Sequence, residues 1–267
     1  MGFSVVKSFC RYCRGELLKD GEDYHIECHT LTEDYSRISG LRMFLNRYGI
    51  SDDIRVIKKL FLEGEKINRL PESIGELENL EKIYINHNEL KTLPESIGNL
   101  KKLRELVLHG NELESLPESI GNLENLRYLN LGNNNLDSLP DSIGDLKDLE
   151  ILYLDYNNLE FLPESIGDLE KLESLILMNN KLESLPESIG KLKYLNVLRL
   201  FNNNLVSLPE SIGELKELNY LDLNNNPELE SLPESISKLE NLRWLELKNT
   251  KIKKEDLPEM LKNNKRW

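Results

Sequence analysis

The sequence predicts an α/β solenoid, in which short parallel strands form one surface and compact turns or helices form the other. Three observations predict it. A six-residue string, Leu-Pro-Glu-Ser-Ile-Gly, recurs along most of the chain. A second pattern, Leu-x-x-Leu-x-Leu-x-x-Asn-x-Leu, lies between successive strings. Each unit carries about seven apolar positions that it cannot bury alone, so the units must stack to form a core.

The repeats themselves are regular in length and number. The string starts at Leu70, Leu93, Leu116, Leu162, Leu185 and Leu208, with close variants at Leu139 and Leu232. The spacing is 23 residues except for the last step of 24, whose extra residue falls within 226–229. The second pattern has strand periodicity at its Leu-x-Leu centre. Counting a degenerate first copy from Ile57, it predicts nine repeats and nine strands.

These motifs resemble the leucine-rich repeat family, specifically its 23-residue Leu-Pro-x-x-Ile-Gly type, which occurs in Ras-associated intracellular scaffolds. The resemblance covers residues 54–256. It implies a leucine-rich repeat solenoid with a curved parallel β-sheet. It also implies an interaction scaffold without enzymatic activity, whose partner is a small GTPase or a signalling complex.

Three columns of repeated residues have predicted structural roles. Seven asparagines occupy one position of successive repeats, and their amides are expected to satisfy buried backbone groups where each strand ends. Glu65 and Thr250 replace asparagine in the first and last repeats. The glycine of each string is expected to support a turn that other residues resist. The serine hydroxyl is expected to bond local backbone. The asparagines are Asn88, Asn111, Asn134, Asn157, Asn180, Asn203 and Asn226.

Residues 1–30 do not repeat and contain a candidate metal site. Cys10-x2-Cys13, followed by His25-x2-Cys28, has the spacing of a structural zinc site. The first half resembles a zinc knuckle, and the second half resembles the His-x-x-Cys half of a LIM-type module. His29 is the alternative fourth ligand. All three cysteines of the chain are then ligands, which predicts a structural zinc rather than a catalytic one.

The two ends of the solenoid need caps that cover the outer core layers. Residues 31–53 have helical spacing at Leu41, Phe44, Leu45 and Tyr48, and Gly49 is the expected stop. They predict a helical N-terminal cap. Residues 257–267 predict a short helical C-terminal cap.

Composition and charge exclude several classes of function. The 267-residue chain carries 34 Lys and Arg against 47 Asp and Glu, a net charge of −13, which disfavours nucleic-acid binding. No transmembrane segment and no signal peptide are found, and clustered cysteines suit a reducing cytoplasm. Neither a phosphate-binding loop nor a nucleophile motif is present, so an enzyme is not expected.

Candidate partner-binding residues lie at the third, fifth and seventh positions of the second pattern, which point away from the core on the expected concave surface. In the middle and later repeats these positions are largely aromatic or aliphatic. Contiguous exposed apolar surface usually marks an interaction site. Asp155 and Asp222 are expected to help orient the partner. The candidates are Tyr128, Ile151, Tyr153, Tyr156, Ile176, Met178, Val197, Arg199, Phe201, Tyr220 and Trp244.

The sequence therefore predicts a cytoplasmic, monomeric protein-interaction scaffold that binds a partner protein on its concave aromatic surface. The alternative is a zinc-module adaptor, in which the N-terminal residues bind nucleic acid or a ubiquitin-like protein. The two differ in which part of the chain contacts the partner.

Overall fold

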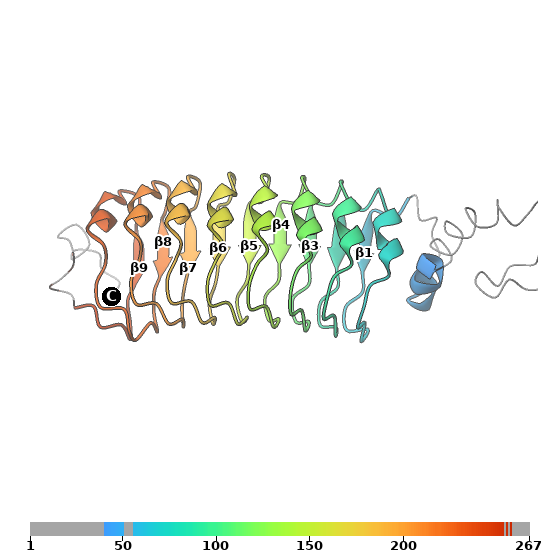
Figure 1. Cartoon of the computed structure of the whole chain (residues 1–267), viewed down its shortest axis with the longest axis horizontal. Helices are drawn as coiled ribbons and strands as arrows, with labels where there is room; N and C mark the ends of the chain where they lie inside the picture. Colours follow the sequence, from blue (N-terminus) through green and yellow to red (C-terminus); the bar gives the residue numbers. More distant parts are fainter. Residues whose placement is uncertain (1–39, 51–55, 254, 256, 258–267) are drawn as a thin grey trace, which may run out of the picture.

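The computed structural model describes residues 40–50, 56–253, 255 and 257. Within them, nine short strands form one parallel sheet in chain order, which confirms the predicted nine-repeat solenoid. Figure 1 shows the repeats side by side along the long axis of the molecule. The strands are β1 (Lys59–Phe61), β2 (Lys82–Tyr84), β3 (Glu105–Val107), β4 (Tyr128–Asn130), β5 (Ile151–Tyr153), β6 (Ser174–Ile176), β7 (Val197–Arg199), β8 (Tyr220–Asp222) and β9 (Trp244–Glu246).

Each Leu-Pro-Glu-Ser-Ile-Gly string folds into one turn of 3₁₀ helix in the segment that returns from one strand to the next. The proline precedes the helix in an extended conformation, which fits its fixed φ. The described residues contain eight such helices: η1 (Glu72–Glu76), η2 (Glu95–Asn99), η3 (Glu118–Asn122), η4 (Asp141–Asp145), η5 (Glu164–Asp168), η6 (Glu187–Lys191), η7 (Glu210–Glu214) and η8 (Glu234–Lys238).

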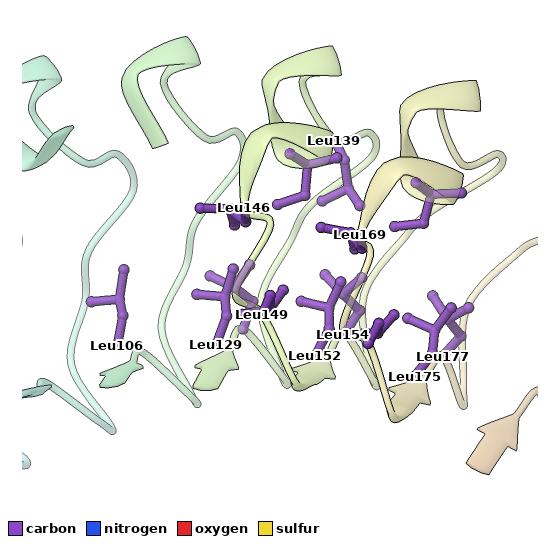
Figure 2. Close-up of a cluster of buried hydrophobic side chains, with 14 of the residues drawn as sticks. Leu106, Leu129, Leu139, Leu146, Leu149, Leu152, Leu154, Leu169, Leu175 and Leu177 are labelled. Carbon is purple, nitrogen blue, oxygen red and sulfur yellow. The ribbon is translucent and has the colours of Figure 1, made fainter. Parts of the chain in front are cut away.

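The apolar positions of the repeat fill one continuous core between the strands and the 3₁₀ helices. Equivalent leucines of successive repeats, such as Leu129, Leu152 and Leu175, lie side by side (Figure 2) and are fully buried. The strands pair in register, so that Leu129 lies opposite Leu152 and Leu152 opposite Leu175. Each repeat therefore buries its apolar residues against the two repeats beside it.

The asparagine column forms the predicted ladder. The Asn157 Oδ1 accepts a hydrogen bond from the Leu136 N–H at 3.0 Å, and its Nδ2 donates to the carbonyls of Leu131 and Leu154, each at 3.0 Å. The other column members make equivalent bonds. Thr250 replaces asparagine in the last repeat, and its hydroxyl donates to the Leu247 carbonyl at 2.8 Å.

The glycines of the strings serve a different purpose from the predicted one. They do not adopt a left-handed conformation, because the described glycines with positive φ are Gly49, Gly64 and Gly110. Instead they allow close approach between repeats: a Cβ on Gly144 would lie 2.4 Å from the Ser165 carbonyl oxygen of the next repeat. The last of the eight strings has Ser237 in place of glycine.

The serine prediction is also wrong for most of the column. In seven serines the hydroxyl oxygen is buried and has no hydrogen-bond partner among the described residues. A hydrogen bond between neighbouring strings instead joins a serine N–H to a glutamate side chain, as where the Ser188 N–H donates to Glu164 Oε2 at 3.2 Å. The seven are Ser96, Ser119, Ser142, Ser165, Ser188, Ser211 and Ser235.

The described part of the expected N-terminal cap contains a helix over residues 40–47. Leu41 and Leu45 are buried in the same core as the repeats, so this helix covers the first core layer. Gly49 follows in a left-handed conformation with φ 74°. Leu257 is buried in the core, and residues 258–267 of the expected C-terminal cap lie outside the described residues. No helix in the described residues has the length and apolar character needed to span a bilayer.

Candidate protein-binding surface

The surface of the sheet that faces away from the core, here called the strand face, carries the third and fifth positions of the pattern. In each strand the central residue points into the core and its two neighbours point outward, as the two-residue period of a strand requires. In β5, for example, Leu152 is buried, whereas Ile151 and Tyr153 are partly exposed. The sequence pattern alone therefore determines which side chains can reach a partner.

Eight of the eleven candidate residues lie on β4 to β9, and Met178 and Phe201 lie two residues after the ends of β6 and β7. Together we call all eleven the aromatic band. The parallel register places them next to one another: Tyr128 lies opposite Ile151, and Tyr153 lies opposite Ile176. The eleventh, Tyr156, lies at the edge where the strands end. The band comprises Tyr128, Ile151, Tyr153, Tyr156, Ile176, Met178, Val197, Arg199, Phe201, Tyr220 and Trp244.

Most of the band is accessible. Nine members are partly exposed and Tyr156 is 55% exposed. Ile176 differs from the prediction, because only 5% of it is exposed. It lies between Tyr153 on β5 and Arg199 on β7, and larger neighbours on both sides cover a smaller side chain. Ile176 therefore supports the band rather than contacting a partner directly.

Neighbouring aromatic rings contact one another across strands. The ring centroids of Tyr128 and Tyr153 are 5.7 Å apart, and those of Tyr220 and Trp244 are 6.4 Å apart. A hollow of about 460 Å³ borders the band where Tyr84, Tyr128 and Ile151 meet Arg104 and Arg127. Rings held this way present a large apolar area with little loss of side-chain entropy on binding.

Arg199 is the one charged member of the band, and its surroundings neutralise it. Its Nη2 lies 3.6 Å from the Asp222 Oδ2, and its guanidinium lies over the Tyr220 ring at 5.7 Å from the centroid. Asp222 is only 3% exposed. Burial raises the pKa of Asp222, while the Asn224 N–H and Arg199 oppose that rise. The Arg199 Nε is buried without a hydrogen-bond partner among the described residues.

His87, His109 and Asp155 lie along the edge where the strands end. The two histidine rings meet edge to face at 5.4 Å. A Cβ on Gly132 would lie 2.7 Å from the Asp155 Oδ1 and 3.0 Å from the His109 Nδ1, so this glycine makes room for both side chains. Burial raises the pKa of Asp155, and His109 and Arg199 act against this effect. Across the described ranges 40–50 and 56–253, no group of three His, Cys, Asp or Glu side chains is placed to hold a metal ion.

A third aromatic pair on the strand face was not among the predicted residues. Phe61, 59% exposed, stacks on Tyr84 with ring centroids 5.0 Å apart. Both occupy the fifth position of the pattern, which is the signal that identifies them. The Tyr84 hydroxyl donates to Glu105, which also accepts from Lys82, and this hydrogen bond raises the pKa of Tyr84 to about 12.

The residue after the seventh pattern position adopts a left-handed conformation in every repeat of the described chain. In seven repeats it is glycine or asparagine, which tolerate positive φ. His87 and Tyr156 are the exceptions, with φ of 52° and 55°. A bulky side chain in this conformation costs about 1–2 kcal/mol. The nine residues are Gly64, His87, Gly110, Asn133, Tyr156, Asn179, Asn202, Asn225 and Asn249.

The predicted zinc ligands Cys10, Cys13, His25 and Cys28, with the alternative His29, lie outside the described residues. The zinc site therefore stays a prediction that depends on the spacing of these residues alone.

Comparison with known proteins extends over most of the chain. A family model described as "Leucine-rich repeat region" matches residues 52–127, 117–203 and 172–265. A search of curated proteins finds no match.

Several solved structures share the fold. A leucine-rich repeat protein of Leptospira interrogans is 37% identical, with a TM-score of 0.60 over 76% of this chain and 57% of that chain. The leucine-rich repeat domain of the type III effector XopL is 23% identical, with a TM-score of 0.59 over 86% and 97%, and shows the fold alone. The ectodomain of the Arabidopsis thaliana receptor kinase GASSHO1/SCHENGEN3, solved in complex with CASPARIAN STRIP INTEGRITY FACTOR 2, is 27% identical, with a TM-score of 0.56 over 75% and 30%. The chain thus spans just over half of the Leptospira protein and less than a third of the plant ectodomain.

Proposed function

Because this chain belongs to the leucine-rich repeat family, we propose that it is a non-enzymatic scaffold that binds a partner protein on its strand face. The family generally mediates protein–protein interaction. The aromatic band is the single observation that carries the proposal for this chain. Aromatic residues, methionine and arginine are the types enriched where proteins bind one another.

The composition of the chain strengthens this argument. The protein has a net charge of −13 and 30% charged residues, yet the band contains a single charged side chain, Arg199. Strand propensity favours aromatic residues on any sheet surface. It does not account for Met178, or for the strained backbone of Tyr156. A contiguous band of this kind on a polar molecule fits a binding surface better.

The class of partner remains a proposal that follows from the resemblance to Ras-associated scaffolds: a small GTPase or another signalling complex. The GASSHO1/SCHENGEN3 complex is a precedent in which a related repeat domain binds another polypeptide. We further propose that the protein acts as a monomer in the cytoplasm. The parallel pairing of the strands already places the band residues next to one another, so we expect binding without a rearrangement of the sheet.

The test is affinity capture from source lysate with the double variant Tyr153→Ser/Phe201→Ser. Both side chains are partly exposed on the strand face, so the variant is expected to fold and to lose a partner that the wild-type protein captures. The matched control is Tyr194→Ser/Phe161→Ser, which removes the same residue types from exposed positions in the connecting segments. If the double variant captures the same proteins as the wild type, the strand face is not the binding site.

The cysteine and histidine spacing of residues 10–28 favours a second candidate, a zinc-module adaptor whose N-terminal residues bind nucleic acid or a ubiquitin-like protein. Metal analysis of the full chain is expected to find zinc that is lost in Cys10→Ser/Cys13→Ser. The adaptor role further requires that Cys10→Ser/Cys13→Ser loses a partner that Tyr153→Ser/Phe201→Ser retains. Absence of zinc from the wild-type protein would remove this candidate.

A further inference from the structure

A groove of about 850 Å³ lies between the N-terminal helix and the first two repeats. The helix over residues 40–47, at the β1 end of the solenoid (Figure 1), forms one wall together with Tyr48. Residues 66–72 and 92–95, at the starts of η1 and η2, form the other wall. The described lining of the groove includes no strand residue, so the groove is separate from the strand face.

The helix turns a different set of residues toward each of its surroundings. Leu41 and Leu45 are buried in the core of the repeats. Arg42 and Asn46 are exposed and lie outside the groove. The remaining positions line the groove and recur at i, i+3, i+4, i+7 and i+8, which places them on one stripe. They are Gly40, Met43, Phe44, Arg47 and Tyr48.

The apolar residues of this stripe are incompletely covered. Met43 is 68% exposed, the largest exposed fraction among the large hydrophobic residues that the structure describes. Phe44 and Tyr48 are partly buried, and their rings meet edge to face with centroids 5.2 Å apart. The outer face of a terminal cap is normally polar. Exposed apolar side chains in a groove therefore indicate an occupant that covers them.

The groove is basic although the protein has a net charge of −13. Arg47, Lys66 and Arg69 line it, against Glu72 and Glu95. None of the three cations forms an ion pair with another residue in the part of the chain that the structure describes. The occupant is therefore expected to carry apolar side chains and a carboxylate.

The chain that directly precedes the groove has this chemistry. Residues 31–39 lie outside the described residues and read Leu-Thr-Glu-Asp-Tyr-Ser-Arg-Ile-Ser. One carboxylate and three apolar residues recur there at the spacing of a helical stripe: Leu31, Asp34, Tyr35 and Ile38.

The connection through Gly40 favours this segment over a separate partner. Because the two are covalently joined, the effective concentration of the segment at the groove is high. A Cβ on Gly40 would meet nothing within 4 Å, so packing does not require glycine there. Its backbone freedom suits a chain that turns back over the groove.

We infer that residues 31–39 fold back over the groove, with their apolar side chains on Met43 and Phe44 and Asp34 toward Arg47 or Arg69. As helices, this segment and the wall from Gly40 to Tyr48 would each be about 14 Å long. The inference does not depend on the proposed function, because the groove is separate from the strand face. A segment of a partner protein and residues 31–39 of a second copy of this chain are the competing occupants.

The experiment measures chymotrypsin cleavage of the Tyr35–Ser36 bond in the full chain by mass spectrometry. The reference is a synthetic peptide of residues 30–42, in which nothing protects the bond. Docking is expected to slow cleavage by about tenfold or more relative to the peptide, since the protease acts on the undocked fraction. This protection is expected to be constant between about 1 and 50 μM protein, because the contact lies within one chain.

Two outcomes of this measurement would overturn the inference. Cleavage as fast as in the peptide would leave the groove free for a partner protein. Protection that rises with protein concentration would assign the groove to a second copy.

Charge exchange tests the contact itself. Arg69→Asp and Asp34→Arg are each expected to raise the cleavage rate by about three- to fivefold, and their combination is expected to restore protection. The same cycle is made with Arg47→Asp. Arg42→Asp, on the solvent side of the same helix, is the matched control and is expected to leave the rate unchanged. Absence of recovery in both cycles would contradict the docked position.

The apolar half of the contact is tested by Met43→Ser, which is expected to raise the cleavage rate by about tenfold. Phe161→Ser, at a similarly exposed position in a distant repeat, is expected to have no effect. Cleavage after the exposed Tyr194 is followed in the same samples, and an unchanged rate there shows that the repeats remain folded. Wild-type protection that no groove variant reduces would overturn the inference.

Discussion

Asn157 shows how one side chain joins two neighbouring repeats. Its amide bonds one N–H and one carbonyl of the preceding repeat, and a carbonyl of its own repeat. Asn157→Ala leaves these buried groups without a partner. We expect the free energy of unfolding to fall by about 1–3 kcal/mol, measured by urea denaturation. Asn135→Ala, at an exposed position of the preceding repeat, is the control. An unchanged midpoint for Asn157→Ala would contradict the ladder.

Tyr84 gives a pH-dependent prediction at the same scale. Its hydrogen bond to Glu105 raises the pKa of the phenol to about 12. The neutral form is favoured in the folded state, so this contribution to stability is complete below the ordinary pKa of about 10. It is lost as the pH rises from there to about 12. Absorbance at 295 nm should show a tyrosine titration near pH 12 that is missing in Tyr84→Phe. In Glu105→Gln, this titration is expected to move toward lower pH.

At the scale of the element, the 3₁₀ helices are packed too closely to accept larger residues. Gly144 contacts the Ser165 carbonyl of the next repeat, so Gly144→Ala is expected to lower the free energy of unfolding by about 1–3 kcal/mol. The last string supplies the control. Ser237 is exposed, and Ser237→Ala is expected to change stability by less than about 0.5 kcal/mol. Equal stability of both variants would show that the contact between helices can relax.

The strands, the 3₁₀ helices and the asparagine ladder differ in how far sequence predicts them. The strand positions and the ladder follow from the 23-residue period, because the same residue types recur at the same place in each repeat. The need for glycine at position 144 cannot be predicted from the period. The atom that a Cβ there would meet is the carbonyl oxygen of Ser165, which lies 21 positions further along the chain. The prediction for the serine hydroxyls is wrong for the same reason. Local sequence suggested a hydrogen bond to local backbone, whereas the packing of the next repeat buries the hydroxyl without a partner.

The candidate site was predictable in outline but not in detail. The alternation of each strand identifies which side chains leave the core, and ten of the eleven band residues are accessible. The burial of Ile176 could not be read from the sequence, because it depends on the sizes of Tyr153 and Arg199 on neighbouring strands. The left-handed backbone of Tyr156 was also not predicted, although the asparagines and glycines of its column carry that signal.

At the scale of the whole molecule, stability is distributed along a line of similar units. Removal of residues 93–115, one full period, joins Thr92 to Leu116 and keeps the pattern continuous. The shortened chain is expected to fold, with an m-value for urea unfolding lower by about one-ninth. The control removes residues 93–112, which shifts every later position relative to its neighbour. That variant is expected to unfold at a lower urea concentration than the variant lacking 93–115. Equal unfolding midpoints of the two variants would argue against a strictly repeating architecture.

The one irregular step of the chain indicates where its length can change. The 24-residue repeat adds its extra residue within 226–229, yet β8 and β9 pair in the same register as the other strands, and Leu229 is still fully buried. The connecting segment after the asparagine therefore absorbs an insertion without disturbing the sheet. For protein engineering, Pro227 and Glu228, both exposed, are the place to insert a foreign loop, an epitope or a fluorescent label beside the strand face.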